Sequence, residues 1–113
     1  MRLTTDFWVS AYLRQSQQAG EFAGLLQKGA MQAGAVFVVV NRLDGTMDLY
    51  SPAPQALFDQ EEGERLFCPL LCRQSEAAVK ARIEKEMRFD RDLWIIERES
   101  RAGTHGLTLV SED

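Results

Sequence analysis

The fold is decided by the apolar stretch Ala35-Val36-Phe37-Val38-Val39-Val40 and by the turn after it, Asn41-Arg42-Leu43-Asp44-Gly45-Thr46. The stretch is continuous, β-branched and aromatic, which predicts a central strand covered on both faces. The pair Asp44-Gly45 lies between two apolar runs and predicts a β-hairpin, because glycine accepts a positive φ without penalty. The alternating residues from Met47 to Tyr50 then form the returning strand.

Two amphipathic segments predict helices, one on each side of these strands in the chain. The first helix begins with Thr4 or Thr5 as its N-cap and ends near Gly20. The second begins after Ser75, which is a good N-cap, and is broken by residues 89–92. Its apolar face is formed by residues at i, i+4 and i+8, which are Val79, Ile83 and Met87.

Several shorter segments complete the predicted sheet. Pro52 and Pro54 should end the pairing of the hairpin, because neither has a backbone N–H to donate. The segment 65–72 is apolar but contains Pro69, so we expect an edge or bulged strand. The segment 60–64 reads as an exposed loop. Two further strands are expected, at residues 22–27 and 93–97, and a short final strand is possible at residues 106–110.

This order of elements predicts one α+β domain spanning residues 1–113, which is an ordinary domain length. Strands joined by tight turns, with helices towards the two ends, favour an antiparallel sheet of four to five strands with two helices packed on it. The expected core residues are Val36, Phe37, Val38, Val39, Leu49, Val79, Ile83, Trp94 and Ile95.

Charge and composition disfavour several classes of partner. The formal net charge is -4, and the basic residues are scattered among acids, so we expect no binding of nucleic acid. The longest apolar stretch, residues 35–40, is too short to span a bilayer, so we expect no membrane segment. Two cysteines and no apolar leader near residue 1 predict a reduced, cytoplasmic protein.

The motifs of common enzyme classes are missing from the sequence. Cys68 and Cys72 have only His105 as a further soft ligand, so we interpret them as core residues and expect no metal site. His105 lies in a turn-like segment without a nucleophile context. The glycines at 20, 24, 29 and 34 fit no phosphate-binding pattern. We therefore expect no cofactor and assign no catalytic residue, which argues against an enzyme.

One weak internal similarity suggests a polar site. Segments 42–50 and 88–94 both run Arg, apolar residue, Asp, and then Asp-Leu-aromatic. Turn chemistry explains this pattern, because Asp side chains accept hydrogen bonds from turn N–H groups. The alternative is that these residues converge beside Tyr50 and Trp94 and bind an anionic ligand. The ligand-binding set would be Arg42, Asp48, Arg88, Asp90 and Asp92, with His105 as a further member.

Three segments together resemble a family of short bacterial proteins known as a domain of unknown function, number fourteen ninety-one. They are Phe7-Trp8-Val9 with Ala11-Tyr12-Leu13-Arg14, the segment 41–54 and the segment 88–94. The resemblance runs from the first helix to the strand after Trp94, except over residues 55–74. It implies a stand-alone bacterial domain of this length. It implies no activity and no catalytic residue.

Two functional hypotheses follow. The first is a non-enzymatic interaction domain, a homo-oligomer or the binder of another protein. An edge strand, either 68–72 or 106–110, would pair with the edge of its partner. The second is a small-molecule binder or minor enzyme whose pocket is lined by the Arg and Asp residues of the two similar segments.

Overall fold

The computed structural model describes residues 4–54 and 65–110. Within these ranges the chain forms two helices and six strands. In chain order they are α1 (Thr5–Gln18), β1 (Ala23–Gln27), β2 (Val36–Asn41), β3 (Thr46–Pro52), β4 (Leu66–Ser75), α2 (Glu76–Phe89), β5 (Trp94–Glu99) and β6 (Thr108–Leu109). The expected loop at 60–64 lies outside the described residues.

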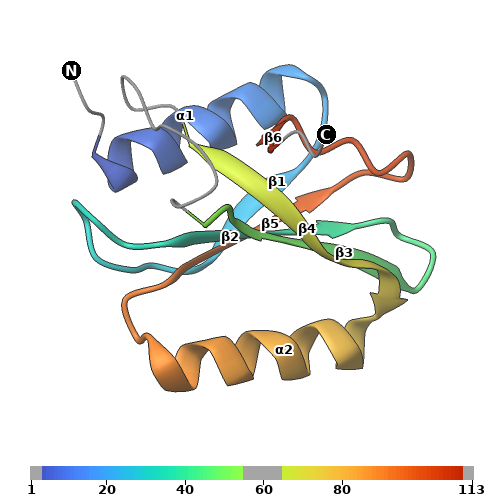
Figure 1. The fold of residues 1–113 in the computed structure, drawn as a ribbon. Coiled ribbons are helices and arrows are strands. Elements are labelled where there is room, and N and C mark those ends of the chain that lie inside the picture. Colours follow the sequence, from blue (N-terminus) through green and yellow to red (C-terminus); the bar gives the residue numbers. More distant parts are fainter. Residues whose placement is uncertain (1–3, 55–64, 111–113) are drawn as a thin grey trace.

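The molecule has three layers, with α1 on one face of the sheet and α2 on the other (Figure 1). The strand order is β1-β5-β2-β3-β4-β6. The pairs β2–β5 and β4–β6 are parallel and the other pairs are antiparallel. The α+β class is confirmed, but the prediction of an antiparallel sheet of four to five strands was wrong. Helix α2 crosses one face of the sheet and returns the chain parallel to β2, between β2 and β1.

The central position of β2 is confirmed. Residues 36–40 are all buried, because β5 and β3 flank the strand and a helix covers each face. The hairpin is also confirmed: Gly45 has φ +92°, and Arg42 N–H donates to the carbonyl of Thr46 at 3.0 Å. Pro52 does not end the pairing, since it lies opposite Phe67 and the next N–H, that of Ala53, donates to Leu66.

Strand β4 is bulged, as Pro69 predicted, and its register against β3 shifts twice. It is not an edge strand at its beginning, because β6 pairs with Leu66 and Phe67. The predicted N-cap of α2 is confirmed: the Ser75 hydroxyl accepts a hydrogen bond from Ala78 N–H at 3.1 Å.

Alternation along the strands creates one core on each face of the sheet. Val36, Val38 and Val40 pack with Val9 and Tyr12 of α1. On the other face, Phe37, Val39, Leu49 and Ile95 pack with Val79 of α2. The expected core residues are buried except Ile83, which is half-buried against the second core. Burial of each such side chain contributes roughly 1.5–3 kcal/mol.

Candidate functional site

Two of the predicted site residues, Arg42 and Asp48, form a buried ion pair on the α1 face. Arg42 Nε and Nη2 lie 2.9 and 2.8 Å from Asp48 Oδ2, and the Asp48 side chain is 2% exposed. The other carboxylate oxygen, Oδ1, accepts from the backbone N–H of Arg73 at 2.8 Å. Both oxygens of this carboxylate are therefore used by the chain itself.

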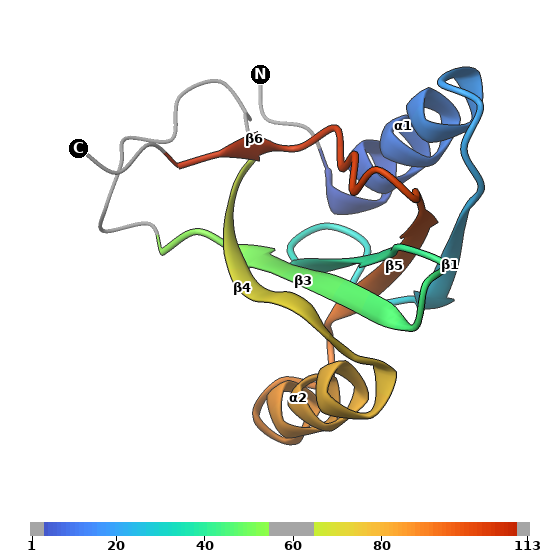
Figure 2. The same cartoon turned by 90° about the vertical axis from the view of Figure 1, so that its right-hand side faces the viewer.

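A second buried cation, Arg98, holds the segment that follows β5 in place through hydrogen bonds. Its Nε donates to Glu21 Oε1 at 2.7 Å, and its Nη1 donates to the carbonyl of His105 at 3.0 Å. The Tyr12 hydroxyl donates to the same carbonyl at 2.7 Å. Hydrogen bonding by Ser100, and then by Arg98, lowers the pKa of Glu21. The chain after β5 is thereby held on the same side of the sheet as α1 (Figure 2).

The His105 ring belongs to this network and is used structurally. Its Nδ1 accepts the backbone N–H of Leu107 at 2.9 Å, and the ring packs on Tyr50 with centroids 4.9 Å apart. Burial, reinforced by the nearby Arg98 guanidinium, lowers the pKa of His105. The acceptor nitrogen of the imidazole is therefore already occupied by the chain itself.

The structure does not bring the six predicted residues together. Because β2 and β5 are parallel, Val36 lies opposite Trp94 and Asn41 lies opposite Glu99. Arg42 follows the end of β2, whereas residues 88–92 precede the beginning of β5, so about 16 Å of strand separates Arg42 from that turn. Arg42, Asp48 and His105 lie at one end of the sheet. At the other end are three exposed side chains, Arg88, Asp90 and Asp92.

Turn chemistry accounts for the similarity between the two segments. Asp44 Oδ1 accepts from Thr46 N–H at 2.9 Å, and Asp90 Oδ1 accepts from Asp92 N–H at 2.9 Å. Each carboxylate thus caps a turn that leads into a strand. Binding of an anionic ligand by these residues stays a prediction.

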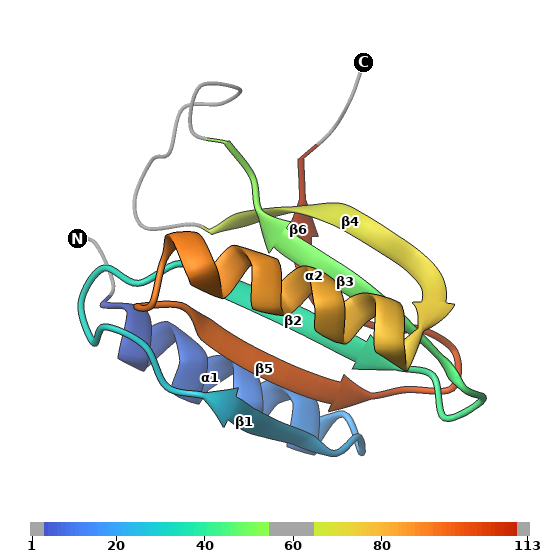
Figure 3. The same ribbon diagram turned by 90° about the horizontal axis from the view of Figure 1, so that it is seen from below.

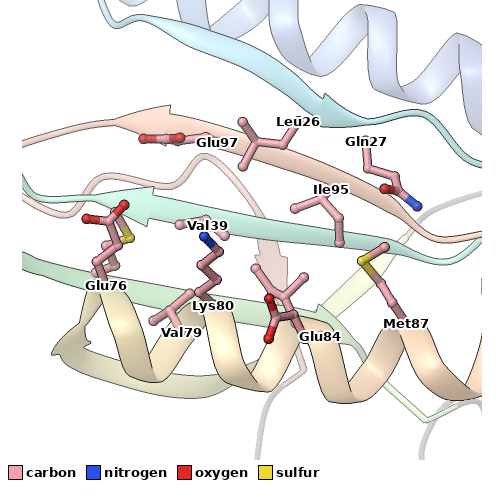
Figure 4. Close-up of a pocket in the computed structure, with 12 residues that line it drawn as sticks. Leu26, Gln27, Val39, Glu76, Val79, Lys80, Glu84, Met87, Ile95 and Glu97 are labelled. Carbon is pink, nitrogen blue, oxygen red and sulfur yellow. The ribbon is translucent and has the colours of Figure 1, made fainter.

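An open cleft of about 470 Å³ lies between α2 and the sheet. Helix α2 packs over β3 and β4. Strands β5 and β1, on the other side of β2, therefore lie beside the helix and not under it (Figure 3). Val39 and Ile95 line the cleft from the sheet, and Val79 and Met87 line it from the helix (Figure 4). We call this cleft the α2 groove.

Strand β1 is the outer wall of the α2 groove and one edge of the sheet. Leu25 pairs with Ile96 and Gln27 pairs with Ile95, so Leu26 is an extra residue in a bulge. The bulge places Leu26 and Gln27 together on the groove side.

The edge also carries exposed apolar side chains. Phe22, Leu25 and Leu26 are 62%, 41% and 59% exposed, and the Phe22 ring lies over Gly24. This surface is not among the sites predicted from the sequence. Its signal was present, because 22–27 is apolar on both faces and yet too short to be a central strand.

The rim of the α2 groove is mainly acidic. Three carboxylates, Glu76, Glu84 and Glu97, stand against one ammonium group, Lys80. Glu76 and Glu97 lie at one end of the groove, and Met87 and Gln27 lie at the other (Figure 4). The groove is therefore charged at one end, towards which Lys80 also lies, and uncharged at the other.

The cysteines are less buried than predicted. Cys68 is half-buried and Cys72 is exposed, because the bulged part of β4 turns away from the core. Across residues 4–54 and 65–110 there is no group of three or more His, Cys, Asp or Glu side chains that could hold a metal ion. No helix in the described part of the chain is long and apolar enough to cross a membrane.

Comparison with known proteins identifies close structural relatives. A family model described as a protein of unknown function (DUF1491) matches residues 3–108. The solution structure of a protein from A. tumefaciens is 41% identical, with a TM-score of 0.85, and the match covers 100% of this chain and 98% of that one. A crystal structure of a DUF1491 family protein from Caulobacter crescentus is 34% identical, with a TM-score of 0.78 and coverage of 98% and 100%. No curated protein matches the chain.

Proposed function

Since this chain belongs to the DUF1491 family of proteins of unknown function, we propose a function from its own geometry: a non-catalytic domain that binds an extended segment of a protein partner along β1. In this mode the partner adds a strand to the sheet, and alternate side chains of the partner enter the α2 groove. Main-chain hydrogen bonds then give affinity, and the groove gives specificity.

The observation that supports this proposal is the combination of an open edge with apolar surface beside it. An exposed edge strand is a template for pairing, which proteins ordinarily blunt with charge. Here the edge carries the exposed side chains of Phe22 and Leu26, and on the opposite face from Leu26 that of Leu25, which pairs with Ile96 of the α1-face core. Exposed apolar side chains at an unpaired edge are typical of interaction sites. The bulge at Leu26 limits the segment that can pair, so a short partner segment fits best.

The compartment we propose is the cytoplasm. Cys68 and Cys72 are both free thiols, which fits a reducing environment.

The test is a selection of displayed random peptides against the immobilised domain, followed by NMR titration of the selected peptides. We expect peptides whose binding shifts the amide signals of residues 22–27 and of the groove side of α2. Loss of one buried leucine contact costs about 2 kcal/mol, so Leu26→Ser should weaken binding more than tenfold.

Phe7→Ser is the matched control, because Phe7 and Leu26 are both 59% exposed and Phe7 lies on α1. Peptide affinity should be unchanged in this variant. Selected peptides that bind Leu26→Ser as well as the unchanged protein would show that β1 is not the binding surface. A selection that enriches no peptide would overturn the proposal.

A further inference from the structure

We infer that the partner segment is basic at one end and apolar along the rest, with a Lys or Arg side chain between Glu76 and Glu97 and aliphatic side chains against Met87 and Leu26. This inference rests on the proposed function and specifies the chemistry of the partner. It follows from the length, the charge and the openness of the α2 groove.

The length of the groove fits a short strand. Glu76 and Met87 are eleven residues apart on α2, which corresponds to about 16 Å along the helix axis. A strand of five residues spans roughly the same distance, and β1 has five residues. A partner strand beside β1 would therefore run alongside the groove, on the outer side of its β1 wall, from the charged end to the uncharged end.

The negative charge of the groove rim favours a partner segment of positive charge. At the charged end, Glu97 Oε2 accepts from Asn41 Nδ2 at 3.0 Å, which holds this carboxylate on the surface of the sheet. Glu76 faces the same end from the first turn of α2, and Lys80, one turn later, lies towards this end too, so two carboxylates and one ammonium group leave one net negative charge there. A cation placed between two carboxylates gains charge-assisted hydrogen bonds, which are stronger than neutral ones. An acidic side chain at this position would be repelled, so the rim discriminates between partners.

The same charges disfavour a second copy of this chain as the occupant. Pairing of β1 with β1 across a two-fold axis would bring two acidic rims beside each other, in a chain whose net charge is already -4. The openness of the groove disfavours a small molecule, because such ligands are usually buried over most of their surface. A peptide uses both the groove and the open edge of β1.

The test compares three matched peptides by NMR titration: acetyl-Lys-Thr-Leu-Thr-Leu-Thr-Lys-amide and its Gln and Glu counterparts. Because the Lys peptide has a lysine at each end, one lysine reaches the charged end of the groove whether the peptide pairs parallel or antiparallel to β1. We expect the Lys peptide to bind at least tenfold more tightly than the Glu peptide in about 50 mM NaCl. This difference should shrink at about 500 mM, because salt screens exposed charges.

Two variants locate the preference on the rim. In Glu76→Gln combined with Glu97→Gln, the Lys peptide should lose its advantage, while the amide oxygen at 97 can still accept from Asn41. The control is Asp6→Asn combined with Asp44→Asn, which removes the same charge from α1 and the hairpin. This control should leave the preference intact. Retention of the preference in the first variant would overturn the inference.

The outcomes separate the inference from the proposed function. If the three peptides bind equally, the basic partner is wrong and strand addition at β1 stands. The same holds if only uncharged peptides are enriched from the random library. Sedimentation that detects a dimer, dissociated by Leu26→Ser, would replace the basic segment by a second copy. If neither the library nor the three peptides bind, both the inference and the proposed function fail.

Discussion

The two faces of the sheet use charge in opposite ways. On the α1 face, Asp48 and Arg98 are buried, and each is held by groups of the same chain. Every buried side-chain polar atom in the described part of the molecule has a hydrogen-bond partner. On the α2 face the charges form the rim of an open apolar groove. Buried charge thus stabilises the interior on the α1 face, whereas the uncovered apolar surface lies on the α2 face, where we propose that a partner binds.

The topology produces this difference. Helix α2 follows β4 directly and must return the chain to β5, which lies beyond β2 and β3 in the sheet. The helix packs on β3 and β4, so β1 at the far edge has no cover from it (Figure 3). On the other face, α1 and the chain after β5 share the covering (Figure 2).

The largest effect should come from Asp48→Ala. This substitution leaves the Arg42 guanidinium, which is 12% exposed, without its carboxylate, and Arg73 N–H without its acceptor. Removal of one partner from a buried pair costs roughly 3–5 kcal/mol. Urea denaturation should show this loss, and the Tm should fall by about 10 °C or more.

The matched control on the other face is Glu84→Gln. Glu84 is exposed on the groove rim, so its loss should change stability by less than about 0.5 kcal/mol. If Asp48→Ala lowered the free energy of unfolding as little as Glu84→Gln, the buried charges would not stabilise the α1 face. The proposed difference between the two faces would then be wrong.

A smaller effect is expected at two glycines of positive φ. Gly45 has φ +92° with open space around it, and Gly103 has φ +78° with the Arg42 guanidinium 2.6 Å from the position of a Cβ. Gly45→Ala should cost about 1 kcal/mol from backbone strain alone. Gly103→Ala should cost about 2 kcal/mol, because the Arg42–Asp48 pair must also shift. Equal costs in thermal unfolding would show that Gly103 does not support the network.

Much of the fold could be predicted because the signals were local. The apolar run 36–40, the Asp44-Gly45 turn and the Ser75 cap each act within a few residues, and each prediction is confirmed. The order of the strands could not be predicted in the same way. Insertion of β5 beside β2 depends on where α2 packs, and this is decided by contacts far apart in the sequence.

The site was harder to predict for a related reason. Arg42 and Asp48 do pair, as their shared segment suggested, but the pair is closed by Arg73 and so is part of the interior. The α2 groove is formed by residues of β1, β2, β3, β5 and α2, and no motif in any one of these segments indicates it. A groove produced by incomplete cover of a sheet leaves no pattern in the sequence of any one element.

The pH dependence of stability should sharpen the account of the α1 face. The pKa of His105 is lowered in the folded protein, so below about pH 6.5 the unfolded chain takes up a proton more readily than the folded one. Stability contributed by the neutral ring is present above that pH and is lost as the pH falls towards the lowered pKa. Protonation would also remove the acceptor for Leu107 N–H.

The measurement is urea denaturation of the unchanged protein and of His105→Asn at pH 7.5 and 5.5. Asn keeps an acceptor oxygen near the position of Nδ1 but does not titrate in this range. The unchanged protein should lose more stability than the variant over this interval, by less than the glycine effects because the ring is only partly buried. Parallel losses in the two proteins would exclude His105 as the titrating group.

The smallest effect should come from the surface that we assign to a partner. Leu26 is exposed in a bulge and Leu49 is fully buried, so the same residue type meets opposite environments on one sheet. Leu26→Ser should change the free energy of unfolding by no more than about 0.5 kcal/mol. Leu49→Ala should cost about 2–5 kcal/mol, because it leaves a cavity. A large loss at Leu26 would mean that this side chain stabilises the isolated fold. In that case no partner would be needed to explain why Leu26 is exposed. The open groove on the α2 face would then be part of the internal architecture, as the Arg42–Asp48 and Arg98 network is on the α1 face.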